Sequence, residues 1–542
     1  MMTKRLGAVL LLGLSVLVGC SELDSQGSGL PTLPPTLTAL PPSTPTDVPI
    51  PDPVNLPSVD WEDIEKFRAA MRPAFANDID DFVNHNRYYI EASLVFENGV
   101  LILHGAERVR YTNRSEDDLN EIVFRLYPNL PAFGGRMNVF RTTLNGEAFE
   151  PNLTERNSAL VFPLATPLEP GESAEMTLEW TLTAEKGIMG GYGEYGYQHD
   201  VFSGPEWYPM LSVYDEETGW WVDRPTSMGD AVYSETGLYE VLLTTPEDFV
   251  VVMSGSEIES FAASNDMTTH HYVSGPMRDS LLVTGPSLGK LTEQVEDITL
   301  NVYYWPGDEV AAEEVMKISL DSMRIFNEQF GPYPYAEFDV AETFNLSGIE
   351  YPGIVIIAQR NWLPGNNFLE VTTAHEIAHQ WWYSLVGNDQ VHQPWLDESL
   401  TSYSEYVYHL GVYGEKRVKE VIEGDRDYYN YYRGTGAADL VLNLPVSAYT
   451  DSNYGMIIYT KGPLFYVELE EMLGRETFMK ALQTYFERYR YQVVRSADIL
   501  NTFEEVSGQQ LDEVFYQWVG NFPGLDQKVV EEMEARQNQQ TQ

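Results

Sequence analysis

The pattern of hydrophobic and polar residues along the chain changes its period near residue 300. Between about residues 86 and 290, apolar residues alternate with polar ones, as in residues 122–126 and 176–182, and clusters of Gly, Pro, Asn and Asp separate these segments. A period of two is typical of strands that pack one face against a core. The pattern therefore predicts an N-terminal all-β domain, a sandwich or a saddle, over residues 86–290.

From about residue 298 the apolar residues recur with helical spacing, as in Val315, Ile318 and Ile325. This spacing places them on one face of a helix. The later segments that the pattern predicts are strands at residues 338–342 and 354–357 and helices at residues 397–411, 415–424, 455–473, 475–489 and 496–506. We therefore expect a mostly helical domain with a small sheet over residues 291–525, and a multidomain α+β chain.

The segments that flank or interrupt these two domains differ in composition. Residues 21–57 are rich in Pro, Thr and Ser, which predicts an extended, solvated spacer. Residues 58–85 carry apolar residues at helical spacing and predict a short lead-in helix. Residues 526–542 form a polar tail, which is expected to fray from Met533 onward. The Gly-, Tyr- and Trp-rich stretch at 187–221 is too irregular for a strand pattern and predicts a long loop.

The first twenty residues have the features of an export signal. Lys4 and Arg5 precede an apolar run at residues 6–18, which is too short for a stable membrane-spanning anchor. The run ends in Leu-Val-Gly-Cys20, which resembles a bacterial lipoprotein signal, in which the cysteine is lipidated and becomes the mature N-terminus. We therefore expect residues 1–20 to be a signal peptide and Cys20 to anchor a bacterial, extracytoplasmic protein to a membrane surface. An ordinary signal peptide with an incidental Cys20 is the alternative.

Charge and cysteine content narrow the class of protein. The net charge is −49, so the chain has little with which to neutralise phosphates, and a nucleic-acid-binding function is excluded. The acidic residues are interpreted as a solvated surface that aids solubility, with a preference for basic substrates as the alternative. Cys20 is the only cysteine, which excludes an intrachain disulfide.

One short pattern, His375-Glu376-Ile-Ala-His379, indicates a metal site. On a helix, residues four apart lie on one face, so His375 and His379 can direct their imidazoles at one point. Two imidazoles at this spacing suit Zn²⁺, and Glu376 can take a proton from a metal-bound water. Structural roles for both histidines are the alternative, since a bare pattern of this kind also arises by chance.

A third ligand is expected from the segment Trp395-Leu-Asp397-Glu398, which follows a short polar loop. Asp397 is a candidate N-cap of a second helix that packs beside the first one. Glu398 can then complete a His-His-Glu set with an open fourth position, as catalytic zinc requires. Glu405, two turns along the same face, can accept a hydrogen bond from a ligand imidazole, although a surface carboxylate is an equal alternative.

These residues carry a resemblance to a known family. The pattern H-E-x-x-H, followed after eighteen residues by Glu398 within Trp-Leu-Asp-Glu, resembles the M1 zinc metallopeptidases, which include aminopeptidase N and leukotriene A4 hydrolase. Two further segments match in order. Ser347-Gly-Ile-Glu350-Tyr resembles the family's G-x-M-E-N, and Ile-Ile-Tyr459-Thr-Lys-Gly resembles its Tyr-x-Lys-Gly segment. The family's Asn is replaced by Asp397, and Ser347, Ile349 and Tyr351 depart from the pattern of the other segment.

The resemblance implies a thermolysin-like catalytic domain with one Zn²⁺ per chain and roles for three more residues. It implies that Glu350 binds the free α-amine of a substrate and that Tyr459 donates a hydrogen bond to the oxyanion. Tyr454 matches a second tyrosine of the family. The alternatives are a simple strand-end charge for Glu350 and a core aromatic for Tyr454.

Two parts of the family pattern lack a clear counterpart. The family's β domain supplies a second amine-binding acidic residue, for which Asp200 and Glu206 are the candidates here. The family also continues into a helical C-terminal domain that closes over the active site, and this chain is expected to lack it. The stretch at 187–221 is a candidate for part of the cover.

The resemblance implies that the chain is a hydrolase that removes N-terminal residues from extracytoplasmic peptides. A zinc endopeptidase of the same fold is the first alternative. The second is a membrane-anchored, non-catalytic binding protein on a peptidase scaffold. Epoxide hydrolysis, known in one branch of the family, remains open.

Overall fold

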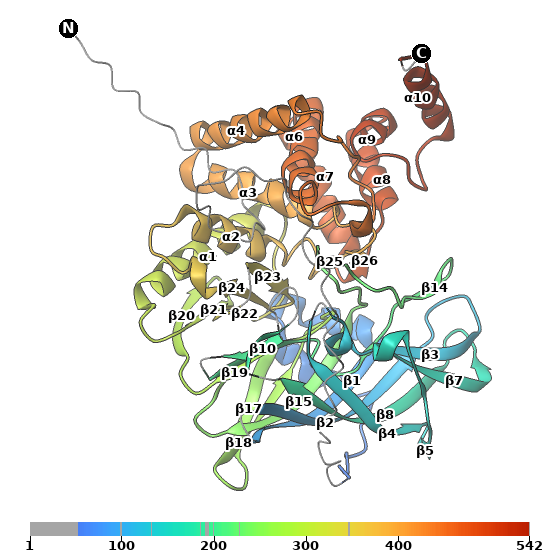
Figure 1. Cartoon of the computed structure of the whole chain (residues 1–542), viewed down its shortest axis with the longest axis vertical. Helices are drawn as coiled ribbons and strands as arrows, with labels where there is room; N and C mark the ends of the chain where they lie inside the picture. The colour runs from blue at the N-terminus through green and yellow to red at the C-terminus, as the bar shows by residue number, and fades with distance from the viewer. Residues whose placement is uncertain are drawn as a thin grey trace, which may run out of the picture.

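A computed structural model describes residues 53–540, except residues 98–99, 132, 185, 190–194, 199, 227 and 345–346. The expected signal peptide, Cys20 and most of the spacer lie outside the described residues. Within the described part of the chain, no helix combines the length and the apolar character needed to cross a bilayer. Figure 1 shows a β part at the bottom and a helical part at the top, with a small sheet between them.

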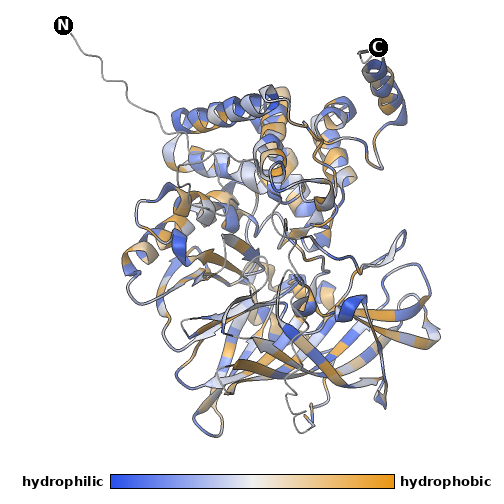
Figure 2. Ribbon diagram, viewed as in Figure 1, coloured by the Kyte–Doolittle hydropathy of each residue, from blue (hydrophilic) through white to orange (hydrophobic). Residues whose placement is uncertain are grey.

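The largest sheet of the β part has eight strands in the order β17-β18-β15-β1-β2-β8-β4-β5. Their bounds are β1 Asn86–Glu97, β2 Val100–Thr112, β4 Arg136–Leu144, β5 Glu147–Ala148, β8 Ser173–Ala184, β15 Gly237–Pro246, β17 Ser256–Ala262 and β18 Met267–Val273. Its pairings are antiparallel except for β1 with β15. The alternation predicted for this region is visible as strands that alternate in hydropathy in Figure 2.

Two smaller sheets and a two-stranded ribbon complete the β part. The four-stranded sheet has the order β12-β3-β7-β6, the five-stranded sheet has the order β16-β19-β11-β10-β9, and the ribbon pairs β13 with β14. Their bounds are β3 Leu119–Arg125, β6 Asn152–Thr154, β7 Ala159–Leu168, β9 Gly187–Met189, β10 Tyr195–Gln198, β11 Val201–Pro205, β12 Met210–Leu211, β13 Tyr214–Asp215, β14 Gly219–Trp220, β16 Val250–Met253 and β19 Leu281–Gly285.

The β-part core is built from the even-numbered residues of β8. Met176, Leu178, Trp180 and Leu182 are fully buried, in register with β2 on one side and β4 on the other. Trp180 lies directly on Gly105 of β2, where a Cβ would come within 2.2 Å of the indole. The β-rich N-terminal part that the sequence predicts is therefore confirmed, and one face of β8 supplies side chains to its core.

The sequence interpretation of residues 187–221 as one long loop is wrong for the described part of that stretch. It contains the short strands β9 to β14, and three of them, β9, β10 and β11, belong to the five-stranded sheet, with β11 paired to β19. Each is two to five residues long. Strands this short do not alternate over enough residues to produce a period-two signal.

The helical part contains a five-stranded sheet with the order β20-β21-β22-β24-β23. Its strands are β20 Gly289–Val295, β21 Ile298–Tyr304, β22 Glu337–Thr343, β23 Gly348–Tyr351 and β24 Ile354–Ala358. The inner three strands are parallel, and both edge strands are antiparallel. The helical pattern expected from residue 298 begins only at α1, because Ile298, Leu300 and Val302 alternate as a strand.

Helices cover this sheet and extend beyond it (Figure 1). Their bounds are α1 Glu309–Gln329, α2 Asn367–Ala378, α3 Glu398–Tyr413, α4 Glu415–Gly434, α5 Tyr454–Met456, a π-helix Ile457–Lys461, α6 Gly462–Leu473, α7 Arg475–Tyr489, α8 Ser496–Ser507, α9 Asp512–Trp518 and α10 Gln527–Gln540. Two-residue strands β25 Val386–Gly387 and β26 Gln492–Val493 pair in parallel. Helix α10, in the tail that was expected to fray, buries Val530 and Met533.

The lead-in segment differs from the single helix predicted for it. It forms two 3₁₀ helices, η1 Glu65–Ala70 and η2 Pro73–Phe82, and Pro73 occupies the first position of the second one. Four more 3₁₀ turns of the described residues lie at Tyr127–Asn129, Glu155–Asn157, Gln359–Asn361 and Val446–Ala448.

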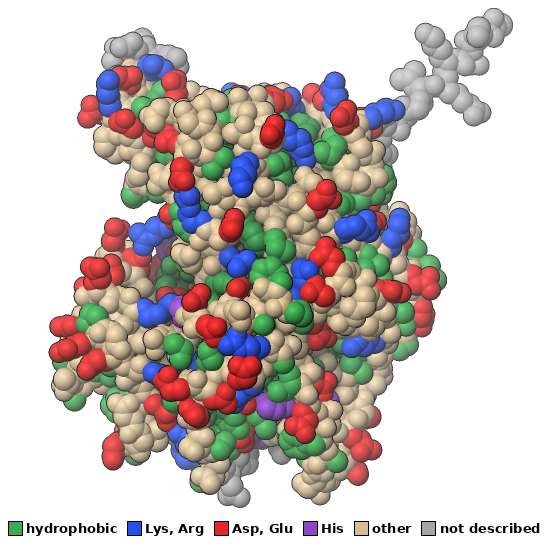
Figure 3. Space-filling view, turned by 180° about the vertical axis from the view of Figure 1, so that it is seen from behind, with side chains coloured by type: hydrophobic (Ala, Val, Ile, Leu, Met, Phe, Trp, Pro, Cys, Tyr) green, Lys and Arg blue, Asp and Glu red, His purple; other side chains and the backbone are tan. Residues whose placement is uncertain are grey.

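Acidic side chains are spread over the helical and the β parts of the face seen in Figure 3, in line with the net charge of −49.

Candidate metal centre

Helix α2 carries the two histidines. Asn366 caps it by accepting a hydrogen bond from the backbone N–H of Phe368 at 3.0 Å. Leu369 and Ile377 are fully buried and fix the helix against the core. His375 lies in the last turn, and His379 is the C-terminal cap residue. The helix therefore ends at the second histidine.

Helix α3 begins at Glu398, as predicted, but its start is not capped as predicted. Asp397 occupies the N-cap position without a side-chain bond to the helix backbone. Its carboxylate accepts hydrogen bonds from Asn388 Nδ2 at 3.0 Å and from Gln390 Nε2 at 2.8 Å. The polar loop before α3 thus positions Asp397, and Asp397 positions the first turn that carries Glu398.

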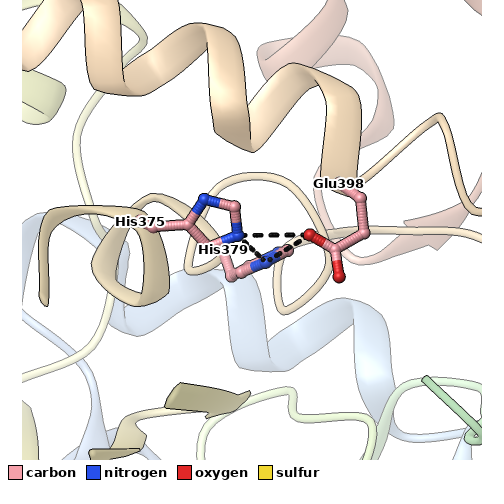
Figure 4. Close-up of side chains that lie close together, drawn as sticks. All are labelled: His375, His379 and Glu398. Carbon is pink, nitrogen blue, oxygen red and sulfur yellow. Dashed lines mark hydrogen bonds and ion pairs between the residues drawn. The ribbon is translucent and has the colours of Figure 1, made fainter. Parts of the chain in front are cut away.

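The structure brings His375, His379 and Glu398 together (Figure 4). His375 Nε2 lies 3.2 Å from His379 Nε2 and 3.2 Å from Glu398 Oε2, and His379 Nε2 lies 3.4 Å from the same oxygen. Tetrahedral ligands about 2.0–2.1 Å from Zn²⁺ lie roughly 3.3 Å from each other. The donor types and their spacing therefore fit a zinc ion held by two imidazoles and one carboxylate.

The other ring nitrogen of each histidine, Nδ1, also has a hydrogen-bond partner. His375 Nδ1 bonds Glu405 Oε1 at 2.8 Å, which places Glu405 where the helical spacing predicted it. His379 Nδ1 bonds the backbone oxygen of Trp382 at 3.0 Å and lies 3.2 Å from the Thr401 hydroxyl. These bonds leave Nε2 of each ring as the metal-binding atom, because an oxygen acceptor requires the proton on Nδ1.

Glu376 lies next to the ligand set and against β23. It is 5% exposed, and a Cβ at Gly348 would come within 2.1 Å of its Oε1. Burial raises the pKa of Glu376 to about 8, although the charges of His375 and His379 oppose the rise. A carboxylate with a raised pKa beside a water ligand is suited to accept and return a proton near neutral pH.

Tyr459 reaches the ligand set from the π-helix. Its hydroxyl donates a hydrogen bond to Glu398 Oε1. The Ser399 hydroxyl donates to the Ile458 carbonyl at 2.7 Å, and a Cβ at Gly462 would lie 2.0 Å from Ser399 Oγ. A π-helical turn packed this closely on α3 directs Tyr459 at the site. Burial, together with the charge of Glu398, keeps the pKa of Tyr459 well above its usual value, so the hydroxyl stays protonated.

Glu350, on β23, belongs to a second group of carboxylates beside the ligand set. Its Oε1 accepts a hydrogen bond from Gln390 Nε2 at 2.9 Å. Carboxylate oxygens of Asp230, Glu350 and Asp397 lie within 4.8 Å of one another. Burial raises the pKa of Glu350 to about 7, and the charges of Glu398 and Asp397 add to the rise. A group of three neighbouring carboxylates suits a cation, because a positive charge offsets theirs.

Asp230 is the site residue that sequence reasoning missed. It comes from the β part, in the segment between β14 and β15. The preceding Gly229 has a φ of 67° and lies against Tyr454, where a Cβ would come within 2.6 Å of the phenol oxygen. Neither sequence candidate for this role belongs to this group of carboxylates. Asp200 is exposed and bonded to Tyr197, and Glu206 is buried after β11.

Tyr454 itself is 6% exposed and packs edge-on against Tyr459 with ring centroids 5.8 Å apart. The structure therefore places Tyr454 beside Tyr459 and the Gly229–Asp230 turn. A Gly-Asp pair within an irregular segment is a common turn signal, so the sequence alone gave no reason to select Asp230.

Comparison with known proteins identifies the domain that holds these residues. Residues 314–518 match the Peptidase family M1 domain. The chain contains an M1 peptidase domain. Its matched segment runs from α1 to the end of α9 and includes every site residue except Asp230. The resemblance inferred from the sequence motifs is thereby confirmed.

Several curated proteins similar to this chain are aminopeptidases. Aminopeptidase 2 of Candida albicans is 23% identical over 298 residues, which cover 52% of this chain and 32% of that protein. Aminopeptidase N of Streptomyces lividans is 24% identical over 239 residues, which cover 41% of this chain and 28% of that protein. The chain thus spans about a third of the length of the curated relatives it matches.

Solved M1 structures extend the likeness to both parts of the chain. The M1 zinc metallopeptidase from Deinococcus radiodurans superposes with a TM-score of 0.58 at 18% sequence identity, covering 82% of this chain and 95% of that chain. At this identity the match establishes the fold. It confirms the predicted fold class, in which a β-rich domain precedes a mostly helical one.

Proposed function

We propose that this protein is a zinc-dependent aminopeptidase that acts on extracytoplasmic peptides. The observation that carries the proposal is the juxtaposition of two groups. His375, His379 and Glu398 form a zinc-type donor set, and the carboxylates of Glu350 and Asp230 lie beside it. The first group suits hydrolysis, and the second suits the free amine of a peptide N-terminus. The aminopeptidases among the curated relatives support the same activity.

The proposed mechanism assigns each step to a residue of this chain. When bound, Zn²⁺ supplies a polarised water and a positive charge beside the scissile carbonyl. Glu376 accepts a proton at its carboxylate and passes it to the leaving amine. Tyr459 donates its O–H to the carbonyl oxygen as negative charge develops there. Its present partner, Glu398, keeps the hydroxyl at the edge of the ligand set.

The amine-binding step distinguishes an aminopeptidase from an endopeptidase. A terminal ammonium can donate to Glu350 and Asp230 and offset their charge, whereas an internal peptide group cannot. Gln390 holds Glu350 and Asp397 together, so the carboxylates proposed to bind the ammonium come from three elements: β23, the loop before α3 and the Asp230 segment.

A reporter panel tests this proposal. Aminoacyl reporters with a free amine should be cleaved, and their N-acetylated forms should not. A chelator should abolish the cleavage, and added Zn²⁺ should restore it. Glu350→Ala and Asp230→Asn should raise KM for free-amine substrates. Equal cleavage of free and acetylated substrates would instead support an endopeptidase. No zinc uptake with no hydrolysis would support the non-catalytic binding protein.

We further propose that lipidation of Cys20 holds the enzyme at a bacterial membrane surface, with the Pro-rich residues 21–57 as a spacer. The Leu-Val-Gly-Cys sequence after a short apolar run supports this. In cells that express the full chain, Cys20→Ala should move the protein from the membrane fraction to the soluble fraction. Mass spectrometry that finds an unmodified Cys20 in the mature protein would contradict it.

A further inference from the structure

The turn that follows α2 contacts the candidate metal ligand His379. It covers residues 382–387 and leads from α2 to β25. Within it, the backbone N–H of Ser384 donates to the His379 carbonyl at 2.9 Å. The Trp382 carbonyl in turn accepts the hydrogen bond from His379 Nδ1 at 3.0 Å. The direction of the peptide group between Trp382 and Tyr383 therefore sets the tautomer and the tilt of the His379 ring.

This peptide group is held in a conformation that Tyr383 does not adopt by preference. Tyr383 has a φ of 141°, a region favoured by glycine, and its side chain is 3% exposed. A bulky residue at positive φ is strained and persists only when its surroundings enforce it. Relaxation of φ to a negative value would rotate the Trp382 carbonyl away from His379. The contacts that prevent this relaxation are therefore part of the ligand's support.

Those contacts come from the β part of the molecule. Arg278 and Asp279 lie one residue before β19, and both are buried, at 1% and 0% exposure. The Tyr383 hydroxyl donates to Asp279 Oδ2. Arg278 Nε donates to the Ser384 carbonyl at 3.2 Å, and its guanidinium lies 5.7 Å from the centre of the Tyr383 ring.

Arg278 also leaves no space on the other side of the turn. A Cβ at Gly387 would come within 2.1 Å of the Arg278 guanidinium carbon. The same guanidinium donates through Nη1 to the Ser234 carbonyl at 2.9 Å, which fixes it to the β part. Burial of the Arg278 guanidinium and the Asp279 carboxyl group at such a contact is costly, and apolar residues would pack two domains together at least as well. These two buried polar side chains therefore call for a role beyond packing.

We propose that Arg278 and Asp279 are positioning residues for the metal ligand His379. They hold Tyr383 at positive φ and so direct the Trp382 carbonyl at Nδ1 of His379. The inference rests on the zinc site of the proposed function. It adds that the β part, outside the matched M1 segment, sets the affinity of that site for its metal.

Zinc affinity of the purified full chain, measured by competition with a chelator, tests the proposal without any substrate. Tyr383→Phe and Asp279→Ala each remove the bond between the two residues. Both should bind Zn²⁺ about 10–100-fold more weakly, the usual effect of losing support for a ligand histidine. Asp279→Asn should stay near the wild-type affinity, because the amide oxygen can accept from Tyr383.

The matched control is Tyr89→Phe. Tyr89 is 8% exposed on β1, and its hydroxyl donates to Glu91 at 2.7 Å, so this variant also loses one tyrosine–carboxylate bond. Its zinc affinity should equal that of the wild type. The proposal is overturned if Tyr383→Phe and Asp279→Ala bind zinc as tightly as the wild type, or if Tyr89→Phe weakens binding as much as they do. A wild-type chain that binds no zinc would instead overturn the proposed function itself.

Discussion

At the scale of single residues, each member of the ligand set has at least one hydrogen-bond partner outside the set. His375 is held by Glu405, His379 by the Trp382 carbonyl and Glu398 by the Tyr459 hydroxyl. The two oxygens of Glu398 have separate partners, because Oε2 faces the histidines and Oε1 faces Tyr459. Removal of one hydroxyl can therefore change the chemistry while leaving the metal in place.

The substitution Tyr459→Phe removes only the hydroxyl that faces Glu398 Oε1. We expect kcat to fall by about 10²–10³, the usual effect of losing one donor to an oxyanion. Zinc content should stay at one ion per chain, because Glu398 Oε2 and both histidines are untouched. Steady-state kinetics together with metal analysis checks this. Unchanged kcat would remove Tyr459 from the mechanism, and loss of zinc would make its role structural.

Glu107 is a residue that affects the free energy of unfolding. It is fully buried on β2, and neither carboxylate oxygen has a hydrogen-bond partner among the described residues. Burial raises its pKa well above the usual value of 4.5, so the folded protein holds Glu107 as the neutral acid. Above pH 4.5 the unfolded chain loses this proton and the folded chain retains it. The free energy of unfolding therefore falls by up to about 1.4 kcal/mol per pH unit until the raised pKa is reached.

Glu107→Met removes this dependence and keeps a similar volume. The variant should have a higher Tm than the wild type at pH 7.5, and the difference should shrink as the pH approaches 4.5. Thermal unfolding of both proteins across this range, in the presence of a fixed zinc concentration, measures it. A difference in Tm that does not change with pH would show that Glu107 is not held neutral.

At the scale of elements, the site depends on how closely neighbouring elements approach. β23 approaches α2 at Gly348, and α6 approaches α3 at Gly462. Both contacts use the missing Cβ of glycine to bring backbone against a functional or supporting side chain. Gly348 is the more direct case, because the atoms it makes room for are those of Glu376.

Gly348→Ala should therefore have the same kind of effect on activity as a substitution of Glu376 itself. A Cβ at this position would lie 2.1 Å from Glu376 Oε1, so the carboxylate must move. We expect kcat/KM to fall by at least about 10², the lower bound for loss of a general base. Zinc affinity should be retained, because no ligand atom is displaced. Gly424→Ala on α4, where a Cβ meets no atom within 4 Å, is the control and should leave activity unchanged.

Helices and strands could be predicted from the sequence where the signal lies in neighbouring residues. The His375–His379 spacing and the long periodic helices α3, α6 and α7 are encoded in neighbouring residues, and the structure has them near the expected bounds. Strands β9 to β14 were missed because they are too short to alternate. Asp230 was missed because its role depends on a contact with Glu350, 120 positions away in sequence, and no local pattern records such a contact.

At the scale of the whole molecule, the β part contributes directly to the metal centre. Asp230 reaches the carboxylate group beside Glu350, and Arg278 and Asp279 hold the turn behind His379. Helices α2 and α3 supply ligands to one point, so a bound metal also joins elements that the chain separates. Folding, metal binding and protonation are therefore linked in this molecule.

This linkage makes zinc affinity depend on pH. Without metal, burial alone would lower the pKa of His379, but the charges of Glu350 and Glu398 raise it to about 9. Burial likewise opposes a raised pKa of His375, and hydrogen bonds to Glu398 and Glu405 outweigh it. Each imidazole must lose its proton to bind Zn²⁺, so the metal competes with protons below pH 9.

We therefore expect the apparent zinc affinity to rise about tenfold per pH unit for each proton released between pH 6 and pH 9. Chelator competition at several pH values measures the slope, and calorimetry in buffers of different ionisation enthalpy counts the protons. Saturating zinc should also raise the Tm, by an amount that grows over the same range, since a ligand at 1,000 times its Kd adds about 4 kcal/mol to the free energy of unfolding. Glu405→Gln should lower the pKa of His375 and so flatten the slope. A pH-independent affinity would mean that neither histidine is protonated in the metal-free protein, and that the carboxylates around them do not set their charge.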